Sequence, residues 1–94
     1  MSNPNKYQLK LFITGKTPRS ELCIANLKSI CDGNLADLYD LIIIDVLERP
    51  QLAEDAKILA TPTLIKELPP PARRIIGDLS DTDKVLFGLG LKHL

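Results

Sequence analysis

Apolar and polar side chains alternate in the first part of the chain. The apolar positions are Tyr7, Leu9, Leu11 and Ile13, and the positions between and after them are Gln8, Lys10, Phe12 and Thr14. A period of two residues is typical of a β-strand, because successive side chains of a strand point to opposite faces. Gly15 marks the predicted end of this strand.

A helical pattern begins directly after this strand. Thr17 is a favoured N-cap residue, and Pro18 suits the first helical position because the N–H that proline lacks has no partner there. The apolar stripe of this helix consists of Cys23, Ile24, Leu27, Ile30 and Cys31. We expect the helix to end at residues 32–34, with Gly33 in the left-handed conformation of a helix cap.

The next apolar segment is continuous rather than alternating. Residues 41–47 form a run rich in β-branched side chains. Such runs are typical of strands that are buried on both faces of a parallel sheet. Strand, helix and strand together predict one right-handed βαβ unit in an α/β domain.

The second half of the chain predicts a further helix followed by two strands. The helical pattern opens at Pro50 and extends to about Leu59. The strand patterns cover residues 63–68 and 74–76, on either side of a triple proline. If a last helix follows, the order is βαβαββα, which is that of the thioredoxin fold. Thr61-Pro62 then lies where that fold has a cis proline before its third strand.

The last segment satisfies two patterns at once. The strand pattern is carried by Val85, Phe87, Leu89 and Leu91, and the helical stripe by Leu86, Leu89 and His93. Ser80 is a candidate N-cap for the helix, with Asp83 in the capping-box position. Gly88 and Gly90 inside such a helix would cost roughly 2 kcal/mol relative to alanine. We therefore expect two competing packings, with the strand dominant in isolation and alanine at both glycines favouring the helix.

Length and charge limit the classes of function. The chain has 94 residues, so we expect a single domain over residues 1–94, stabilised further by self-association. Its 12 basic and 12 acidic residues balance, which does not favour binding to nucleic acid or anionic lipid. No apolar run approaches the ~20 residues of a membrane helix, and the N-terminus lacks a signal-peptide core. We expect a cytoplasmic protein.

The chain lacks the residues that most enzymes of this fold class need. A thioredoxin-like oxidoreductase carries a reactive cysteine at the start of its first helix, whereas residues 16–20 contain none. Cys23 and Cys31 are too far apart along a helix to form a disulfide, so we expect buried, reduced thiols. Asp45 and Asp78 are expected to cap strand ends. Metal-ligand spacing and a phosphate-binding glycine loop are missing, so we expect no enzyme activity and no cofactor.

Three sequence blocks resemble the KaiB family of circadian clock proteins. They are ILATPTL at residues 58–64, LPPP at residues 68–71 and RRIIGDLS at residues 73–80. A weaker match over the first half extends the resemblance to nearly the whole chain. It implies a non-enzymatic regulator of biological rhythms that is metamorphic in its C-terminal half. The family's tetrameric ground state has the order βαββααβ, and its rare monomeric state has the thioredoxin-like order βαβαββα.

The resemblance also implies partners and site residues. In the switched state the family binds the first ATPase ring of KaiC and then sequesters KaiA. By this match the partner-binding positions are Lys10, Lys57, Arg73 and Arg74, and the fold-switch positions are Thr61, Pro62, Gly88 and Gly90. The refolding region of the family coincides with residues 80–94, where the periodicity is ambiguous.

Several positions depart from the family pattern. They are Lys16, Leu22, Asp40, Ile42 and Gly90, where clock proteins commonly have Asn, Arg, Ala, Lys and Asp. These departures predict an altered partner-binding face, and we interpret the chain as a diverged KaiB paralogue that serves a KaiC homologue. Two alternatives remain open: the thioredoxin-like sensor domain of the kinase SasA, which also docks on KaiC, and a redox or glutathione-dependent enzyme.

Overall fold

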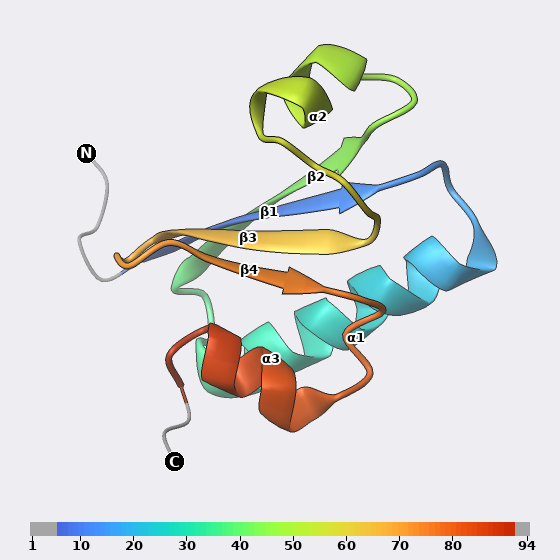
Figure 1. Ribbon diagram of the computed structural model, residues 1–94. Helices are drawn as coiled ribbons and strands as arrows, with labels where there is room; N and C mark the ends of the chain where they lie inside the picture. Colours follow the sequence, from blue (N-terminus) through green and yellow to red (C-terminus); the bar gives the residue numbers. More distant parts are fainter. Residues whose placement is uncertain (1–5, 92–94) are drawn as a thin grey trace.

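A four-stranded mixed sheet forms the centre of the computed structural model, which describes residues 6–91 (Figure 1). The elements are β1 (Tyr7–Ile13), α1 (Pro18–Asn34), β2 (Tyr39–Asp45), α2 (Pro50–Asp55), β3 (Thr63–Leu68), β4 (Arg73–Ile76) and α3 (Thr82–Gly88). The strand order is β2-β1-β3-β4, with β1 parallel to β2 and the other two pairs antiparallel. This order of elements is the predicted thioredoxin order.

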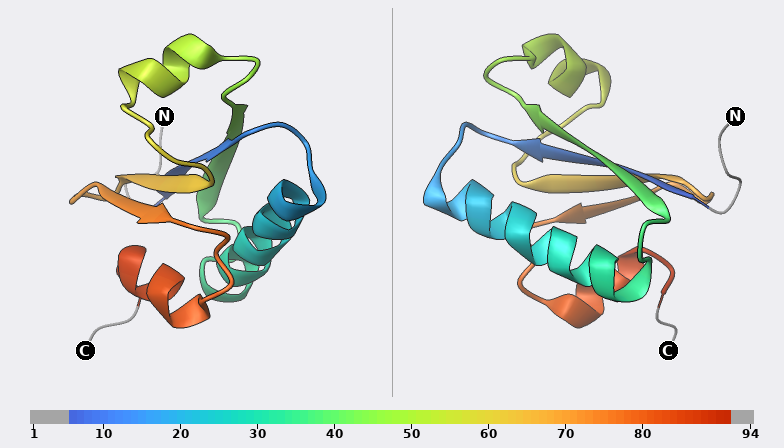
Figure 2. Two further views of the ribbon diagram at one scale, coloured as in Figure 1. Left: turned by 45° about the vertical axis from the view of Figure 1, so that its right-hand side comes forward. Right: turned by 180° about the vertical axis from the view of Figure 1, so that it is seen from behind.

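The helices divide unequally between the two faces of the sheet. Helices α1 and α3 lie on one face, and the short α2 lies beyond the other, near one end of the strands (Figures 1 and 2). The larger apolar cluster is formed by Leu9, Leu11, Ile13, Cys23, Leu27, Ile30, Cys31, Leu35, Leu64, Ile75, Leu79, Val85 and Leu89. A smaller cluster of Phe12, Ile44 and Ile65 lies under α2. Much of the α2 face is therefore left without a covering element.

The predicted start of α1 is confirmed, and its predicted end is partly wrong. The Thr17 hydroxyl accepts the N–H of Ser20 at 3.1 Å, and the Ser20 hydroxyl accepts the N–H of Thr17 at 2.8 Å, a reciprocal capping box. The helix ends at Asn34, inside the predicted range. Gly33 remains within the helix, and the left-handed φ of 51° belongs to Ala36.

Strand β2 exists as predicted, but its predicted burial on both faces is wrong. The strand spans Tyr39–Asp45 and pairs in register with β1. It is an edge strand, so α1 covers one of its faces and α2 reaches the other only at one end. Ile42 is 52% exposed as a result, whereas Ile44 is buried. The run of β-branched residues predicted the strand but not its position at the edge of the sheet.

Helix α2 is shorter than its sequence pattern. The pattern extended to about Leu59, but the helix ends at Asp55, and Lys57 has a left-handed φ of 56°. Two strands then follow as predicted, and the Thr61–Pro62 bond between α2 and β3 is cis, also as predicted. The Leu68–Pro69 and Pro70–Pro71 bonds of the connection between β3 and β4 are cis as well.

The C-terminal segment is helical in this structure. The cap of α3 is Asp81, whose side chain accepts the N–H of Lys84 at 3.1 Å, and not Ser80, whose own N–H bonds to Asp78. None of the helices among residues 6–91 is long and apolar enough to cross a membrane. His93, part of the predicted helical stripe, lies outside the described residues.

The end of α3 explains Gly90. The N–H of Leu91 bonds to the carbonyl of Leu86 at 2.8 Å, and that of Gly90 to the carbonyl of Phe87 at 3.1 Å. These two bonds form a Schellman motif, in which Gly90 takes the required left-handed φ of 76°. Gly90 therefore ends the helix and is not a flaw within it, so the expectation that alanine here favours the helix is wrong.

Gly88 lies where α3 approaches β4. A Cβ atom at this position would come within 2.4 Å of the Ile75 Cδ1 and 2.6 Å of its Cγ1. Alanine at position 88 would stabilise the helix only if the buried Ile75 side chain moved away from the added Cβ atom. The expected gain of roughly 2 kcal/mol from both glycines is therefore not available in this packing.

Candidate partner-binding surface

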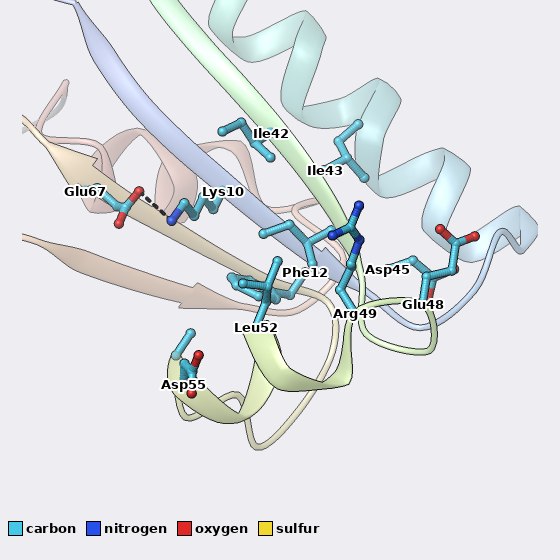
Figure 3. Close-up of a pocket in the computed structure, with 12 residues that line it drawn as sticks. Lys10, Phe12, Ile42, Ile43, Asp45, Glu48, Arg49, Leu52, Asp55 and Glu67 are labelled. Atoms are coloured by element: carbon cyan, nitrogen blue, oxygen red, sulfur yellow. Dashed lines mark ion pairs between the residues drawn. The ribbon is translucent and has the colours of Figure 1, made fainter.

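The uncovered face of the sheet forms an open groove beside α2. Figure 3 shows this groove, whose lining includes Lys10, Phe12, Ile42, Ile44, Leu52 and Glu67. Strand alternation and parallel register place Lys10 and Phe12 of β1 on this face together with Ile42 and Ile44 of β2. Ile42 is 52% exposed and Leu52 of α2 is 43% exposed. The groove thus presents apolar side chains to solvent.

Ion pairs surround the apolar part of this face. Lys10 Nζ lies 3.2 Å from a carboxylate oxygen of Glu67, and Figure 3 shows the two side chains directed toward each other. Asp40 lies 3.1 Å from Lys6 and accepts a hydrogen bond of 3.1 Å from Gln8. These contacts, the Lys6 hydrogen bond first, hold the pKa of Asp40 below its usual range. Of the predicted partner-binding residues, Lys10 is therefore on this face but already paired.

Arg74 has a structural contact that the sequence does not reveal. Its Nη1 donates to the carbonyl of Lys57 at 3.2 Å, and its Nη2 donates to the carbonyl of Ala56. The guanidinium thus holds the chain just after α2 against β4. The structure brings Arg74 and Lys57 together, through the backbone of Lys57. The Lys57 side chain lines a separate shallow depression with Leu59, which is 96% exposed.

Arg73 does not join this set. It neighbours Arg74 on β4, so strand alternation places it on the opposite face of the sheet. There it lies opposite Lys66 of β3, whose side chain is buried. Burial, and next the positive charge of Arg73, lower the pKa of Lys66. Sequence reasoning missed Lys66, although its alternation with the buried Leu64 could have placed it on the helix-covered face.

The positions that depart from the family pattern do not lie on one face. Asp40 and Ile42 share the open face of β2, as their spacing of two residues requires. Leu22 lies on α1, which covers the opposite face, and is 55% exposed. Asp40 and Ile42 therefore change the open face, whereas Leu22 changes a different surface.

The region around the cis proline corresponds to the place where thioredoxins carry their reactive cysteine. It forms a small depression lined by Thr14, Thr17, Ser20, Thr61 and Pro62, among others. The Ser20 hydroxyl is buried and donates to the carbonyls of Gly15 and Thr17, at 2.9 Å each. These contacts give Ser20 a capping role and provide no base that would activate its hydroxyl.

Both cysteines are poor nucleophiles. They are fully buried free thiols, and burial is the main cause that raises the pKa of each to about 11. The thiolate is the reactive species, so little of it exists near neutral pH. This argues against the redox alternative. Within residues 6–91, no three of the potential metal-ligating His, Cys, Asp or Glu side chains cluster together.

The two carboxylates expected to cap strand ends do so. Asp45 accepts the backbone N–H of Gly15 at 3.0 Å and that of Leu47 at 2.9 Å, which fixes the turns after β1 and β2. Asp78 accepts the N–H of Ser80 at 3.0 Å, and its hydrogen bonds to Ser80 lower its pKa. Both residues stabilise loops.

Comparison with known proteins gives the family. The model of the KaiB domain matches residues 10–91. The circadian clock protein KaiB3 of Synechocystis is 58% identical over 87 residues, which is 93% of this chain and 85% of that protein. The circadian clock oscillator protein KaiB of Prochlorococcus marinus (strain MIT 9515) is 56% identical over 91 residues, covering 97% of this chain and 84% of that protein.

Solved structures give the fold. The N-terminal domain of SasA from Synechococcus elongatus superposes with a TM-score of 0.77 at 26% identity, over 100% of this chain and 92% of that one. Mitochondrial thioredoxin 3 of Saccharomyces cerevisiae superposes with a TM-score of 0.68 at 19% identity, over 96% and 80%. The chain has a thioredoxin-like fold, and by its sequence it belongs to the KaiB family of circadian clock proteins.

Proposed function

We propose that this protein is a non-enzymatic, cytoplasmic regulator that docks on the first ATPase ring of a KaiC-type protein. It acts in circadian rhythm or in a related timing or stress pathway. Membership of the KaiB family supports the regulatory role. The buried, high-pKa thiols and the capping role of Ser20 argue against catalysis at the thioredoxin position.

The open face of the sheet carries this proposal. It exposes Ile42 and Leu52 above the buried Phe12, and charged pairs border them. An apolar centre with a polar rim is the usual composition of a protein–protein interface. Arg74 contributes by fixing the chain after α2 at the border of this face, and Lys57 adds a cation beside the exposed Leu59.

Two further features belong to the proposal. The thioredoxin-like form described above is the one that binds the ATPase, and a homotetramer with a C-terminal strand is the resting form. Thr61 and Pro62 precede the segment that would refold, residues 80–94, and Gly88 and Gly90 lie within it. Capture of a KaiA-like protein is the proposed second step, on a surface changed by Leu22, Asp40 and Ile42.

A SasA-type docking role is the second candidate. The superposition on the SasA domain over the whole chain favours it. Both candidates use a thioredoxin-like docking domain and differ in the output: a SasA-type domain needs an attached kinase, whereas a KaiB-type domain acts through its own binding and release.

The test measures binding to a purified KaiC-type ATPase ring by light scattering and calorimetry. Ile42→Glu should weaken the complex by roughly tenfold or more, because it places a charge in an apolar contact. Leu22→Glu is the matched control, since Leu22 is equally exposed on the opposite side of the sheet. Equal affinities for the two variants would remove the open face from the binding site. No binding by the wild-type chain would reject the proposed function.

A further inference from the structure

A second groove lies at the other edge of the sheet, between β4 and α3. Its lining includes Arg73, Arg74, Ile76, Lys84 and Phe87. Ile76 and Phe87 are each 55% exposed, although both belong to regular elements. Strand alternation turns Arg74 and Ile76 toward the α2 face, so the exposed apolar side chain on the α3 side is that of Phe87, beside Arg73 and Lys84. The groove lies at the opposite end of the strand order from β2.

The charge of this groove is one-sided. Its lining includes three basic residues, of which Arg73 and Lys84 are on the α3 side, and no acidic residue, while the whole chain has 12 basic and 12 acidic residues. The ion pairs formed by Lys6 and Lys10 involve none of these cations. The nearby Asp81 carboxylate is occupied at the cap of α3. The groove therefore complements a negatively charged partner.

The three cationic side chains differ in the partners that they already have. Arg74 is directed toward the carbonyls of Ala56 and Lys57, and Lys84 Nζ donates to the carbonyl of Ile76 at 3.2 Å. Arg73 is exposed and lies opposite Lys66, a cation that can only repel it. The guanidinium of Arg73 is thus the group best placed to take a carboxylate in a two-pronged hydrogen bond.

The outer edge of β4 offers backbone groups as well. The N–H of Gly77 bonds to the carbonyl of Pro62, toward β3, so alternation turns the backbone groups of Ile76 and Arg74 outward. Lys84 covers one of them, the Ile76 carbonyl, which is a common protection of an edge strand. An extended chain that carries carboxylates could form backbone hydrogen bonds with this edge. Lys84 would then leave the Ile76 carbonyl and pair with a carboxylate of that chain.

We propose that the groove between β4 and α3 binds an extended, acidic segment of a partner protein, in which a carboxylate and an apolar residue stand two positions apart, so that both side chains face α3. The segment adds to the edge of β4, places a carboxylate on Arg73 and buries an apolar side chain against Phe87. This is strand addition guided by charge. The open face and the ATPase proposed to bind there are not required for it.

The experiment uses the full chain and a blocked heptapeptide of sequence Glu-Thr-Val-Asp-Glu-Thr-Leu, which puts carboxylates and apolar side chains on the same face of the strand. NMR titration should shift the amides of residues 73–77 and 84–88, and the affinity should fall as salt is raised. Arg73→Gln should weaken binding about tenfold and Phe87→Ala severalfold. Lys28→Gln, which removes an exposed cation on α1, is the matched control and should leave binding unchanged.

A second peptide, in which Gln and Asn replace Glu and Asp, separates charge from β-pairing. It should bind at least tenfold more weakly. The proposal is overturned if both peptides bind alike, if Arg73→Gln binds like Lys28→Gln, or if the shifts fall on Lys10, Ile42 and Leu52. Absence of any binding of the acidic peptide at low salt also overturns it, and none of these results bears on the ATPase assay.

Discussion

At the scale of one residue, Gly90 would destabilise a helix that ran through it, but it is required where the helix ends. Within a longer helix it would lower stability, but here it follows α3 with a φ of 76° and completes the Schellman motif. Gly90→Ala should therefore lower the free energy of unfolding by about 1 kcal/mol. Gly90→Asn should cost clearly less, because asparagine tolerates this conformation.

Urea unfolding monitored by circular dichroism would measure both variants. An alanine variant as stable as the wild type would show that the left-handed end of α3 is not populated in solution. A variant more stable than the wild type would restore the original expectation, in which the glycine only penalises the helix.

The buried thiols give a dependence on alkaline pH. Burial raises the pKa of Cys23 and Cys31 from 9.0 to about 11, so the folded state holds these protons more tightly than the unfolded chain. This contribution to stability is complete below pH 9.0 and is lost as the pH rises to about 11. The free energy of unfolding should accordingly fall over this range.

The double variant Cys23→Ala/Cys31→Ala isolates this effect. It should be less stable near neutrality, because buried atoms are removed, but its stability should fall less between pH 9 and pH 11. Lys66 acts in the opposite direction, since its lowered pKa makes the folded state gain stability as the pH rises toward 10.5. Parallel pH curves for the wild type and the double variant would contradict the assignment to the thiols.

At the scale of elements, the packing of α3 on β4 depends on Gly88. Gly88→Ala alone should fall short of the roughly 1 kcal/mol that alanine normally adds to a helix, because its Cβ meets the side chain of Ile75. The shortfall should shrink in an Ile75→Val background, with a coupling of at least about 0.5 kcal/mol in the double-mutant cycle. Gly33→Ala, with no atom within 4 Å of its Cβ, is the control for an unhindered helical glycine.

Arg74 links α2 to the sheet, and this should be visible in hydrogen exchange. Arg74→Ala should speed exchange of the amides of Ala56 and Ile58, which follow α2, because the carbonyls of Ala56 and Lys57 lose their donors. Arg73→Ala, one residue away but on the other face, should leave these amides unchanged. Loss of ATPase binding in Arg74→Ala together with unchanged exchange would instead assign Arg74 to direct contact with the partner.

The sequence predicted the elements whose signals are local. Thr17 and Pro18 fixed the start of α1, and alternation fixed β1, because caps and strand period depend on neighbouring residues. The exposure of Ile42 could not be predicted, since it depends on β2 being at the edge of the sheet. The end of α2 also depends on a distant contact, the one made by Arg74 of β4.

At the scale of the whole molecule, the fold could be predicted and the site only in part. The order of elements and the family blocks both gave the thioredoxin-like arrangement. The family match singled out Lys10 and Arg74, but their pairing with Glu67 and with the carbonyls after α2 needed coordinates. The family match grouped Arg73 with Arg74, although strand alternation separates their side chains across the sheet.

The fraction of tetramer should depend on the equilibrium between the helical form and a form with a C-terminal strand. Leu89 is fully buried in the helical form, and Leu86 and Leu91 pack on the same core, so a strand form must re-cover these side chains between chains. Gly90→Ala strains only the helical form, and about 1 kcal/mol should raise the ratio of strand to helical form roughly fivefold. We expect a larger tetramer fraction in sedimentation velocity at micromolar concentration and slower binding to a KaiC-type ATPase, whereas Gly90→Asn should resemble the wild type. A Gly90→Ala variant that unfolds more easily yet sediments like the wild type would show that this chain has one fold and no tetrameric resting form.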